Sequence, residues 1–240
     1  MLSKQTPLPI TNFYEHIKHE DNALRHYPNE SKMNIPLPAR ILCVGTSGSM
    51  KTNCILNLAR DIGIWDKVVI LAKNLEEPLY KHMIEAYRKL EKKHKIMIIL
   101  AITDITDLPT VNDFDPKENT LLICDDFICE KESSLAKLTE IFIRGRKNGV
   151  TSVFISQSYF RTPMLIRQNV NQIIMKKLSS VKDLGRIMSE YALGETPEEI
   201  MQKYKKAVAG APQNFFLIDV ITNNEELRYR KNWAPFSWYE

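Results

Sequence analysis

The chain has 240 residues, 44% of them apolar, which is enough for one sizeable hydrophobic core, and no shift in composition divides it. The longest apolar run, 96–102, is far shorter than the roughly 20 residues that a membrane-spanning helix needs, and the polar N-terminus has no signal-peptide core. We therefore expect a soluble, intracellular protein with no membrane span. The net charge of +4 permits contact with nucleic acid but does not by itself argue for it.

The cysteines indicate a reducing compartment rather than a metal site. Cys43, Cys54, Cys124 and Cys129 lie mostly in apolar segments and lack the paired C-x2-C spacing of a zinc site. We expect them to be reduced residues of the core.

The two ends of the chain differ from its body. Residues 1–38 contain five prolines and no sustained apolar period, which predicts an arm that wraps over the body or stays partly mobile. The last eight residues, WAPFSWYE (233–240), form an aromatic tail. This tail is either an anchor on a neighbouring subunit or capsid, or a flap over its own sheet edge. The domain between them is expected at 39–232.

From residue 39 onward, short β-rich apolar runs alternate with helical segments. The runs read as buried parallel strands and lie at 40–45, 67–72, 95–103, 120–126, 151–157 and 172–178. This alternation predicts an α/β domain with a mostly parallel central sheet, in which ligands bind beyond the carboxyl ends of the strands. Segments 213–221 and 226–233 come late and are expected to add edge strands.

Two helices lie between these runs. The first is amphipathic, with its apolar face predicted at Leu79, Met83, Ala86, Tyr87 and Leu90. The second carries Leu135, Leu138, Ile141 and Phe142. Ser133 or Ser134 is expected to cap its start, and Gly149 to follow its end as a stop signal.

The stretch GTSGSMKT (45–52) nearly matches a phosphate-binding loop, which requires Gly, four free residues, Gly, Lys and Ser or Thr. It follows a predicted strand and opens a predicted helix, so backbone N–H groups and the helix N-terminus are positioned to hold phosphate oxygens. Lys51 is expected to reach the β- and γ-phosphates of ATP, and Thr52 to offer its hydroxyl to Mg²⁺. The predicted nucleotide-binding residues are Gly45, Thr46, Ser47, Gly48, Ser49, Met50, Lys51 and Thr52.

Two carboxylates complete the pattern of a magnesium-nucleotide site. Asp125 and Asp126 end a buried apolar strand. We expect Asp125 to hold the metal ion and Asp126 to orient or deprotonate the attacking water. Gln157, at the tip of the next predicted strand, is placed to contact the γ-phosphate or the water.

Arg144 and Arg146 end the helix that precedes this strand. Cations at a helix C-terminus are favoured by its dipole without any catalytic role, whereas an arginine finger contributes roughly 10³ to 10⁵ in rate. The residues alone leave both alternatives open.

Together, GTSGSMKT, LLICDD (121–126) and above all GRKNGVTSVFISQSYFRTPMLIRQNVNQIIMKK (145–177) resemble the FtsK–HerA superfamily of P-loop ATPases. Within that superfamily the chain is most similar to the DNA-packaging ATPases of large DNA viruses and virophages, the poxvirus-like branch. The resemblance covers roughly 39–220 and implies a three-layer α/β/α sandwich. It also implies that Arg146, three residues before Gly149, reaches into a neighbouring subunit's site, and that Gln157 senses the γ-phosphate.

The chain departs from the family pattern at two positions. The family usually has Gly where this chain has Met50, and often Glu where it has Asp126. Aspartate is a shorter base, so hydrolysis is expected to be slow. Met50 costs about 1 to 3 kcal/mol if its backbone conformation is unusual, and nothing if its angles are those of ordinary helix entry.

The sequence therefore predicts an ATP-driven motor that uses ATP and Mg²⁺ to move double-stranded DNA into a capsid as a homo-oligomeric ring, a pentamer or hexamer. Capsid vertex or portal proteins are candidate partners, in the host cytoplasm (virus factory) or the virion. The alternatives are a related helicase or DNA-segregation ATPase, or a non-hydrolysing nucleotide-binding scaffold. Basic clusters at 88–95, 144–147, 175–177, 203–206 and 228–231 are expected to be mostly solvated faces, although a motor needs some of them on DNA phosphates.

Overall fold

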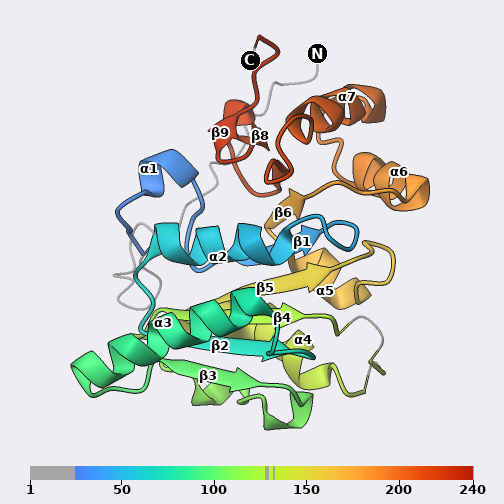
Figure 1. Cartoon of the computed structure of the whole chain (residues 1–240). Helices are drawn as coiled ribbons and strands as arrows, with labels where there is room; N and C mark the ends of the chain where they lie inside the picture. Colours follow the sequence, from blue (N-terminus) through green and yellow to red (C-terminus); the bar gives the residue numbers. More distant parts are fainter. Residues whose placement is uncertain (1–24, 128–129, 132, 240) are drawn as a thin grey trace, which may run out of the picture.

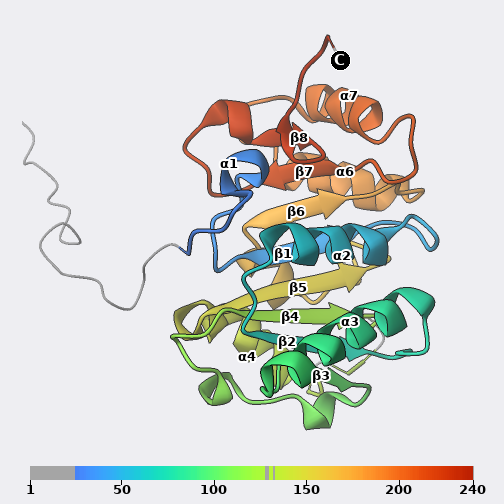
Figure 2. The same cartoon turned by 60° about the vertical axis from the view of Figure 1, so that its left-hand side comes forward.

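The computed structural model describes residues 25–127, 130–131 and 133–239, and a nine-stranded sheet runs through this part of the chain. The strand order is β3-β2-β4-β5-β1-β6-β7-β8-β9, and Figure 2 shows the strands stacked from β3 at the bottom towards β8 at the top. Helices cover both faces of the sheet (Figure 1). The predicted α/β class and three-layer architecture are confirmed.

Six strands are parallel and correspond to the six predicted apolar runs. They are β1 (Arg40–Val44), β2 (Lys67–Ala72), β3 (Ile99–Ile102), β4 (Thr120–Asp125), β5 (Val150–Ser156) and β6 (Gln172–Met175). Only β3 starts clearly later than predicted. The preceding helix ends at Lys95 in a left-handed conformation, and the next two residues, Ile96 and Met97, are exposed.

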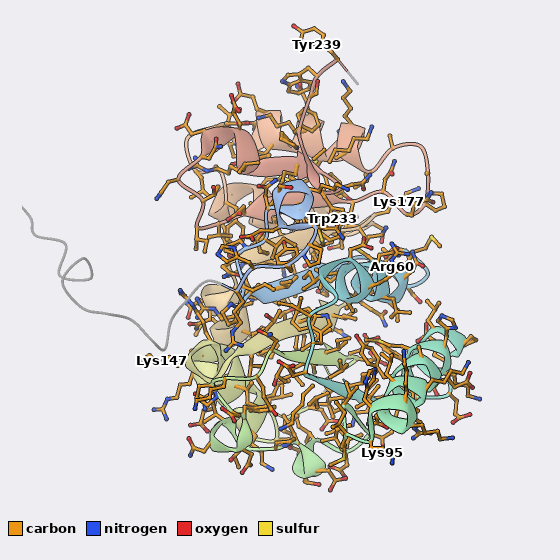
Figure 3. All side chains as sticks on the ribbon, turned by 90° about the vertical axis from the view of Figure 1, so that its left-hand side faces the viewer. Arg60, Lys95, Lys147, Lys177, Trp233 and Tyr239 are labelled. Atoms are coloured by element: carbon orange, nitrogen blue, oxygen red, sulfur yellow. The ribbon has the colours of Figure 1, made fainter. Side chains whose placement is uncertain are left out.

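Three short antiparallel strands extend the sheet beyond β6, as the late segments predicted. They are β7 (Phe216–Asp219), β8 (Tyr229–Lys231) and β9 (Ala234–Pro235). The aromatic tail contributes β9, and Phe236 packs against the core. The first part of the tail is therefore a flap over its own sheet edge, whereas Tyr239 is fully exposed and points away from the body (Figure 3).

The helices divide between the two faces of the sheet. Figure 3 looks along the strands and shows the helix ending near Lys95 on one side and the segment around Lys147 on the other. The helices α2 (Lys51–Ile62) and α3 (Pro78–His94) share one buried cluster, whereas α4 (Ala136–Arg144), α5 (Met164–Asn169), α6 (Val181–Glu190) and α7 (Pro197–Ala207) share the other. Cys43, Cys54 and Cys124 are buried and free, and Cys129 lies outside the described residues.

The apolar face predicted for α3 is wrong in part. The residues it buries are Tyr80, Met83 and Ile84, while Ala86 and Leu90 are exposed. The face that packs is rotated from the predicted one, because the buried residues and the half-buried Tyr87 follow the spacing i, i+3, i+4 and i+7. The second half of the helix still meets the sheet, since Glu91 accepts hydrogen bonds from the N–H groups of Ile98 and Ile99 at the start of β3.

The serine cap predicted for α4 is also wrong. The residue before this helix is Leu135, which makes no side-chain cap. Backbone bonds close the preceding turn instead, since the N–H groups of Ser134 and Leu135 donate to the carbonyl of Lys131. Gly149 does act as the stop, with φ of 70° after the short 3₁₀-helix Gly145–Asn148.

Two of the basic clusters contain buried cations rather than solvated ones. Lys176 donates to the carbonyls of residues 212–214 at 2.7–3.1 Å, and Arg230 pairs with Asp219 at 3.2 Å. Both side chains are fully buried because these acceptors replace water. Arg230 also donates to the carbonyls of Met33 and Asn34 and so fastens the N-terminal segment to β8.

The described part of the predicted arm, residues 25–38, packs on the body. It contains the short helix α1 (Glu30–Met33), and Tyr27, Met33, Ile35 and Leu37 are buried with β1 and α2. Residues 1–24 of the arm lie outside the described part, so the boundary at 38 stays a prediction. Among the helices that the structure describes, none combines the length and apolarity that crossing a membrane requires.

Candidate nucleotide-binding site

The first residues of the segment 45–52, which we call the phosphate loop, are hydrogen-bonded to the ends of two strands. The N–H of Gly45 donates to the carbonyl of Ser156, the last residue of β5, and the N–H of Thr46 donates to the carbonyl of Lys177, just after β6. A Cβ on Gly45 would lie 2.6 Å from the Cβ of Lys176 and from the Oγ of Ser49. This position therefore requires glycine, because β6 passes too close for any side chain.

The loop enters α2 through a left-handed residue. Gly48 has φ of 72°, and Met50, immediately before the helix, has φ of 63° and ψ of 35°. Of the two alternatives that the sequence left open for Met50, the structure shows the unusual conformation. An L-residue pays about 1–2 kcal/mol there, because its Cβ approaches the following carbonyl oxygen.

Lys51 turns back onto its own loop. Its Nζ donates to the carbonyls of Gly45 and Thr46, both at 2.9 Å. Burial lowers the pKa of Lys51, and the nearby Asp125 and Asp126 act in the opposite direction to a smaller extent. The lysine therefore occupies the mouth of the loop and bonds to carbonyls that a phosphate ligand would replace.

A cavity of about 290 Å³ joins the phosphate loop to the predicted acidic and glutamine side chains. Asp125 comes from the end of β4, Asp126 follows it with φ of 64°, and Gln157 comes from the tip of β5. Gly45 and Thr46 do not line it. The lining residues are Ser47, Gly48, Ser49, Met50, Lys51, Thr52, Asn53, Ala72, Lys73, Asn74, Glu77, Leu79, Tyr80, Asp125, Asp126 and Gln157.

The carboxylate of Asp125 is held by a tyrosine. Tyr80, buried in the first turn of α3, donates from its hydroxyl to Oδ2 at 2.5 Å. Burial raises the pKa of Asp125 to about 6, although the bond from Tyr80 and the charge of Lys51 both lower it. The acid is therefore pre-oriented but poorly solvated, an environment that a bound cation would relieve.

Four residues that line the cavity were not predicted from the sequence, namely Lys73, Asn74, Glu77 and Tyr80. All four follow β2 at the same sheet edge as the phosphate loop. The rule that ligands bind beyond the carboxyl ends of parallel strands could have marked this segment. Nothing in its composition distinguishes it from an ordinary strand-to-helix connection.

The donor set suits a phosphate-bound Mg²⁺ rather than a closed metal site. Thr52 and Asp125 bring oxygen ligands to the cavity, and the buried Oγ of Ser49 has no hydrogen-bond partner. Within the described ranges, no three His, Cys, Asp or Glu side chains gather as a metal site. An ion here would take most of its ligands from phosphate oxygens and water, which is the usual arrangement for Mg²⁺.

Arg146 lies away from this cavity. It precedes β5 whereas Gln157 follows it, so a strand of seven residues separates them by roughly 20 Å. Arg146 is exposed, and among the described residues it forms no ion pair; its charge adds to burial in lowering the pKa of Arg40. Arg144 instead pairs with Glu140 at 2.9 Å on its own helix.

Several solved structures are similar to this chain, and the first described here supports the fold. The crystal structure of B204, the DNA-packaging ATPase from Sulfolobus turreted icosahedral virus, aligns with a TM-score of 0.50 at 13% identity, over 76% of this chain and 93% of that one. The structure of the genome-packaging NTPase B204 from Sulfolobus turreted icosahedral virus 2 in complex with AMP aligns with a TM-score of 0.49 at 16% identity. This alignment covers 76% of this chain and 93% of that one. The cytoplasmic domain of the Thermomonospora curvata type VII secretion ATPase EccC aligns with a TM-score of 0.47 at 14% identity. This alignment covers 95% of this chain and 34% of that one.

The family is established by sequence. No curated protein matches the chain significantly. The profile of one protein family, described as "Poxvirus A32 protein", matches residues 26–228, which is most of the chain. The predicted resemblance to the poxvirus-like branch is thereby confirmed, and the chain belongs to the poxvirus A32 protein family.

Proposed function

We propose that this chain is the ATP-hydrolysing subunit of a motor that packages double-stranded DNA into a viral capsid. Membership of the poxvirus A32 family supports the packaging role, and B204, which shares the fold, is described as a DNA-packaging ATPase. The single observation that carries the chemistry is the cavity in which the phosphate loop faces Asp125, Asp126 and Gln157.

Five side chains in the cavity have roles that their positions support. Lys51 binds the β- and γ-phosphates, and Thr52 and Asp125 hold Mg²⁺. Bound Mg²⁺ would neutralise charge on the phosphate oxygens. Asp126 orients or deprotonates the attacking water, and Gln157 contacts the γ-phosphate or that water.

Nucleotide binding requires Lys51 to exchange partners. Its two bonds to the loop carbonyls give way to bonds with phosphate oxygens, which are stronger because both partners are charged. The mouth of the loop opens in the same step.

Arg146 serves the site of a neighbouring subunit in this proposal. It lies too far from the cavity of its own chain, it is exposed, and no described acidic side chain neutralises it. A homo-oligomeric ring, a pentamer or hexamer, would place it at the next γ-phosphate. The motor would act on double-stranded DNA without reading sequence, with capsid vertex or portal proteins as docking partners, in the virus factory of the host cytoplasm or in the virion.

The decisive measurement is phosphate release from ATP with and without double-stranded DNA. We expect release that DNA stimulates, and losses of at least a hundredfold in Lys51→Ala and Asp126→Asn, because each removes charge aimed at the reacting phosphate. Full activity in Lys51→Ala would refute the proposal. A capsid-free assay of strand unwinding separates a packaging motor from a helicase.

A second candidate is a nucleotide-binding scaffold that does not hydrolyse ATP. Two observations favour it, namely the left-handed backbone of Met50 and the short carboxylate of Asp126 with its φ of 64°. This candidate predicts ATP binding by calorimetry without phosphate release. A large gain of rate in Met50→Gly would show that the native loop is impaired.

A further inference from the structure

A cluster of exposed cations surrounds one aromatic side chain just beyond the tip of β5. Phe160 is 46% exposed, with the Nζ of Lys182 4.2 Å and the guanidinium of Arg186 5.6 Å from its ring centre. Arg161 follows it and is also exposed. We call Phe160, Arg161, Lys182 and Arg186 the Phe160 cluster.

A buried carboxylate connects this cluster to the nucleotide site. Asp183, in the first turn of α6, is only 2% exposed. It accepts hydrogen bonds from the Ser158 hydroxyl at 3.3 Å, from the Tyr159 N–H at 3.2 Å and from the Phe160 N–H at 2.9 Å. Gln157, which lines the nucleotide cavity, is the residue directly before this bonded segment.

The other end of α6 holds the same segment. The hydroxyl of Tyr159 donates to Glu190 and lies 3.0 Å from the hydroxyl of Tyr191, and its ring packs under the guanidinium of Arg167. Tyr159 is fully buried. Residues 158–160 and α6 are therefore fastened together at both ends of the helix, so a displacement of one carries the other.

We propose that the Phe160 cluster contacts the phosphate backbone of double-stranded DNA, and that Asp183 links this contact to Gln157. The cluster presents three cations, one from the loop after β5 and two from α6. Of the two acids that bond to it, Asp183 is buried and Glu190 pairs with Arg186 at 2.5 Å. Stacking on Phe160 keeps the Lys182 and Arg186 side chains in place. Such a surface fits a regular polyanion, which it binds without reading base sequence.

The location agrees with such a contact. Figure 1 shows α6 on the side towards which the arrows of β1 to β5 point, which is the edge that also carries the nucleotide cavity. Phe160 and Arg161 of the cluster then lie three and four residues after Gln157 in one loop, and Lys182 and Arg186 lie on the helix that is bonded to that loop. This inference depends on the proposed motor function, and it identifies the Phe160 cluster as the surface through which the motor binds double-stranded DNA.

DNA affinity in a salt series tests the contact. A fluorescein-labelled duplex of mixed sequence is titrated with the parent, with Arg161→Gln/Lys182→Gln/Arg186→Gln, and with the control Lys89→Gln/Lys92→Gln/Lys93→Gln. The control removes the same charge from the exposed face of α3. We expect the cluster variant to bind at least tenfold more weakly than the control. Its slope of log K against log salt should be shallower by about 2 to 3, since each phosphate contact contributes about 0.9.

The outcomes separate this inference from the proposed function. If the parent binds no duplex, the motor function and the contact surface are both refuted. If the parent binds but the cluster variant matches the control, only the surface is refuted, which is the result expected of a cluster that serves an acidic protein partner instead.

The link through Asp183 has its own readout. In the parent, duplex affinity should differ between complexes with a non-hydrolysable ATP analogue and with ADP. In Asp183→Asn the ratio of the two duplex affinities, with the ATP analogue and with ADP, should approach one. The reason is that an amide cannot accept all three hydrogen bonds that the carboxylate accepts. Ser158→Ala removes one bond and keeps the buried carboxylate, so it should reduce the ratio even if the first variant folds poorly. A ratio unchanged in both variants would overturn the link.

Discussion

Met50 and Asp126 line the same cavity with nearly identical left-handed backbones, at φ of 63° and 64°. One begins the helix that the phosphate loop opens, and the other follows the acidic strand. Neither is glycine, the residue that adopts this conformation at no steric cost. Asn34, Lys95, Leu193 and Asn232 also have positive φ among the described residues, so what distinguishes Met50 and Asp126 is their position at the cavity.

Met50→Gly should stabilise the protein. Relief of the left-handed strain outweighs the added entropy of glycine in the unfolded chain by about 1 kcal/mol. For a chain of this length that corresponds to an increase in Tm of roughly 2–4 °C, measured by thermal denaturation without nucleotide. Met50→Ala is the matched control, because it removes the side chain but keeps the strain. An equal rise in both variants would assign the effect to the side chain.

Gly45→Ala should weaken nucleotide binding. The new Cβ would lie 2.6 Å from Lys176, whose own Cβ belongs to a buried strand end and cannot move aside. Such overpacking costs typically 1–3 kcal/mol and displaces the loop. Calorimetric titration with ATP should show affinity at least tenfold weaker.

The same substitution at Gly185 provides the contrast. A Cβ on Gly185 in α6 meets no atom within 4 Å, so Gly185→Ala should raise stability by about 0.5–1 kcal/mol through helix propensity. Parent-like ATP affinity in Gly45→Ala would contradict the close approach of β6 to the loop.

Tyr80→Phe should increase the Mg²⁺ requirement of ATP hydrolysis. The hydroxyl holds Asp125 in one orientation, and hydrogen bonds to charged groups contribute about 1.5–3 kcal/mol. The Mg²⁺ concentration for half-maximal phosphate release should rise roughly tenfold, while ATP binding measured in a chelator stays as in the parent. Tyr87→Phe, a half-buried tyrosine later in the same helix, is the control. Equal Mg²⁺ dependence in both variants would exclude a positioning role for Tyr80.

Mixing variants should reveal whether Arg146 acts between subunits. Arg146→Ala and Lys51→Ala should each be inactive alone, and their mixture should recover part of the activity, because some interfaces then combine an intact loop with an intact arginine. Arg144→Ala should remain close to the parent, since its pairing with Glu140 on an exposed helix face contributes little. Absence of any recovery would argue for a role within one subunit or for none.

The parallel strands and the acidic pair were predictable because both signals are local. The seven residues TLLICDD are enough to predict a buried strand with a polar end, and the eight residues of the phosphate loop are enough to predict phosphate binding. The backbone angle of Met50 was not predictable, since the spacing of the motif permits either conformation. The start of the loop is also held by hydrogen bonds to Ser156 and Lys177, which lie more than 100 residues away and which the motif does not specify.

Tyr80 shows the same limitation at the site. Its role depends on α3 lying over the end of β4, and a helical period cannot specify which strand lies beneath it. The burial of Lys176 and Arg230 was likewise hidden, because their carbonyl and carboxylate partners are distant in sequence. Long-range polar pairs are what single-sequence periodicity does not encode.

Strand β5 has a further consequence for a ring of these chains. It carries Arg146 before its first residue and Gln157 after its last, and all seven of its residues are buried between β4 and β1. A strand paired on both sides cannot stretch or shorten. In the proposed ring, β5 would therefore hold two successive catalytic centres at a fixed distance. Gln157 at one end of the strand would contact the subunit's own nucleotide, and Arg146 at the other end would contact the nucleotide of the neighbouring subunit.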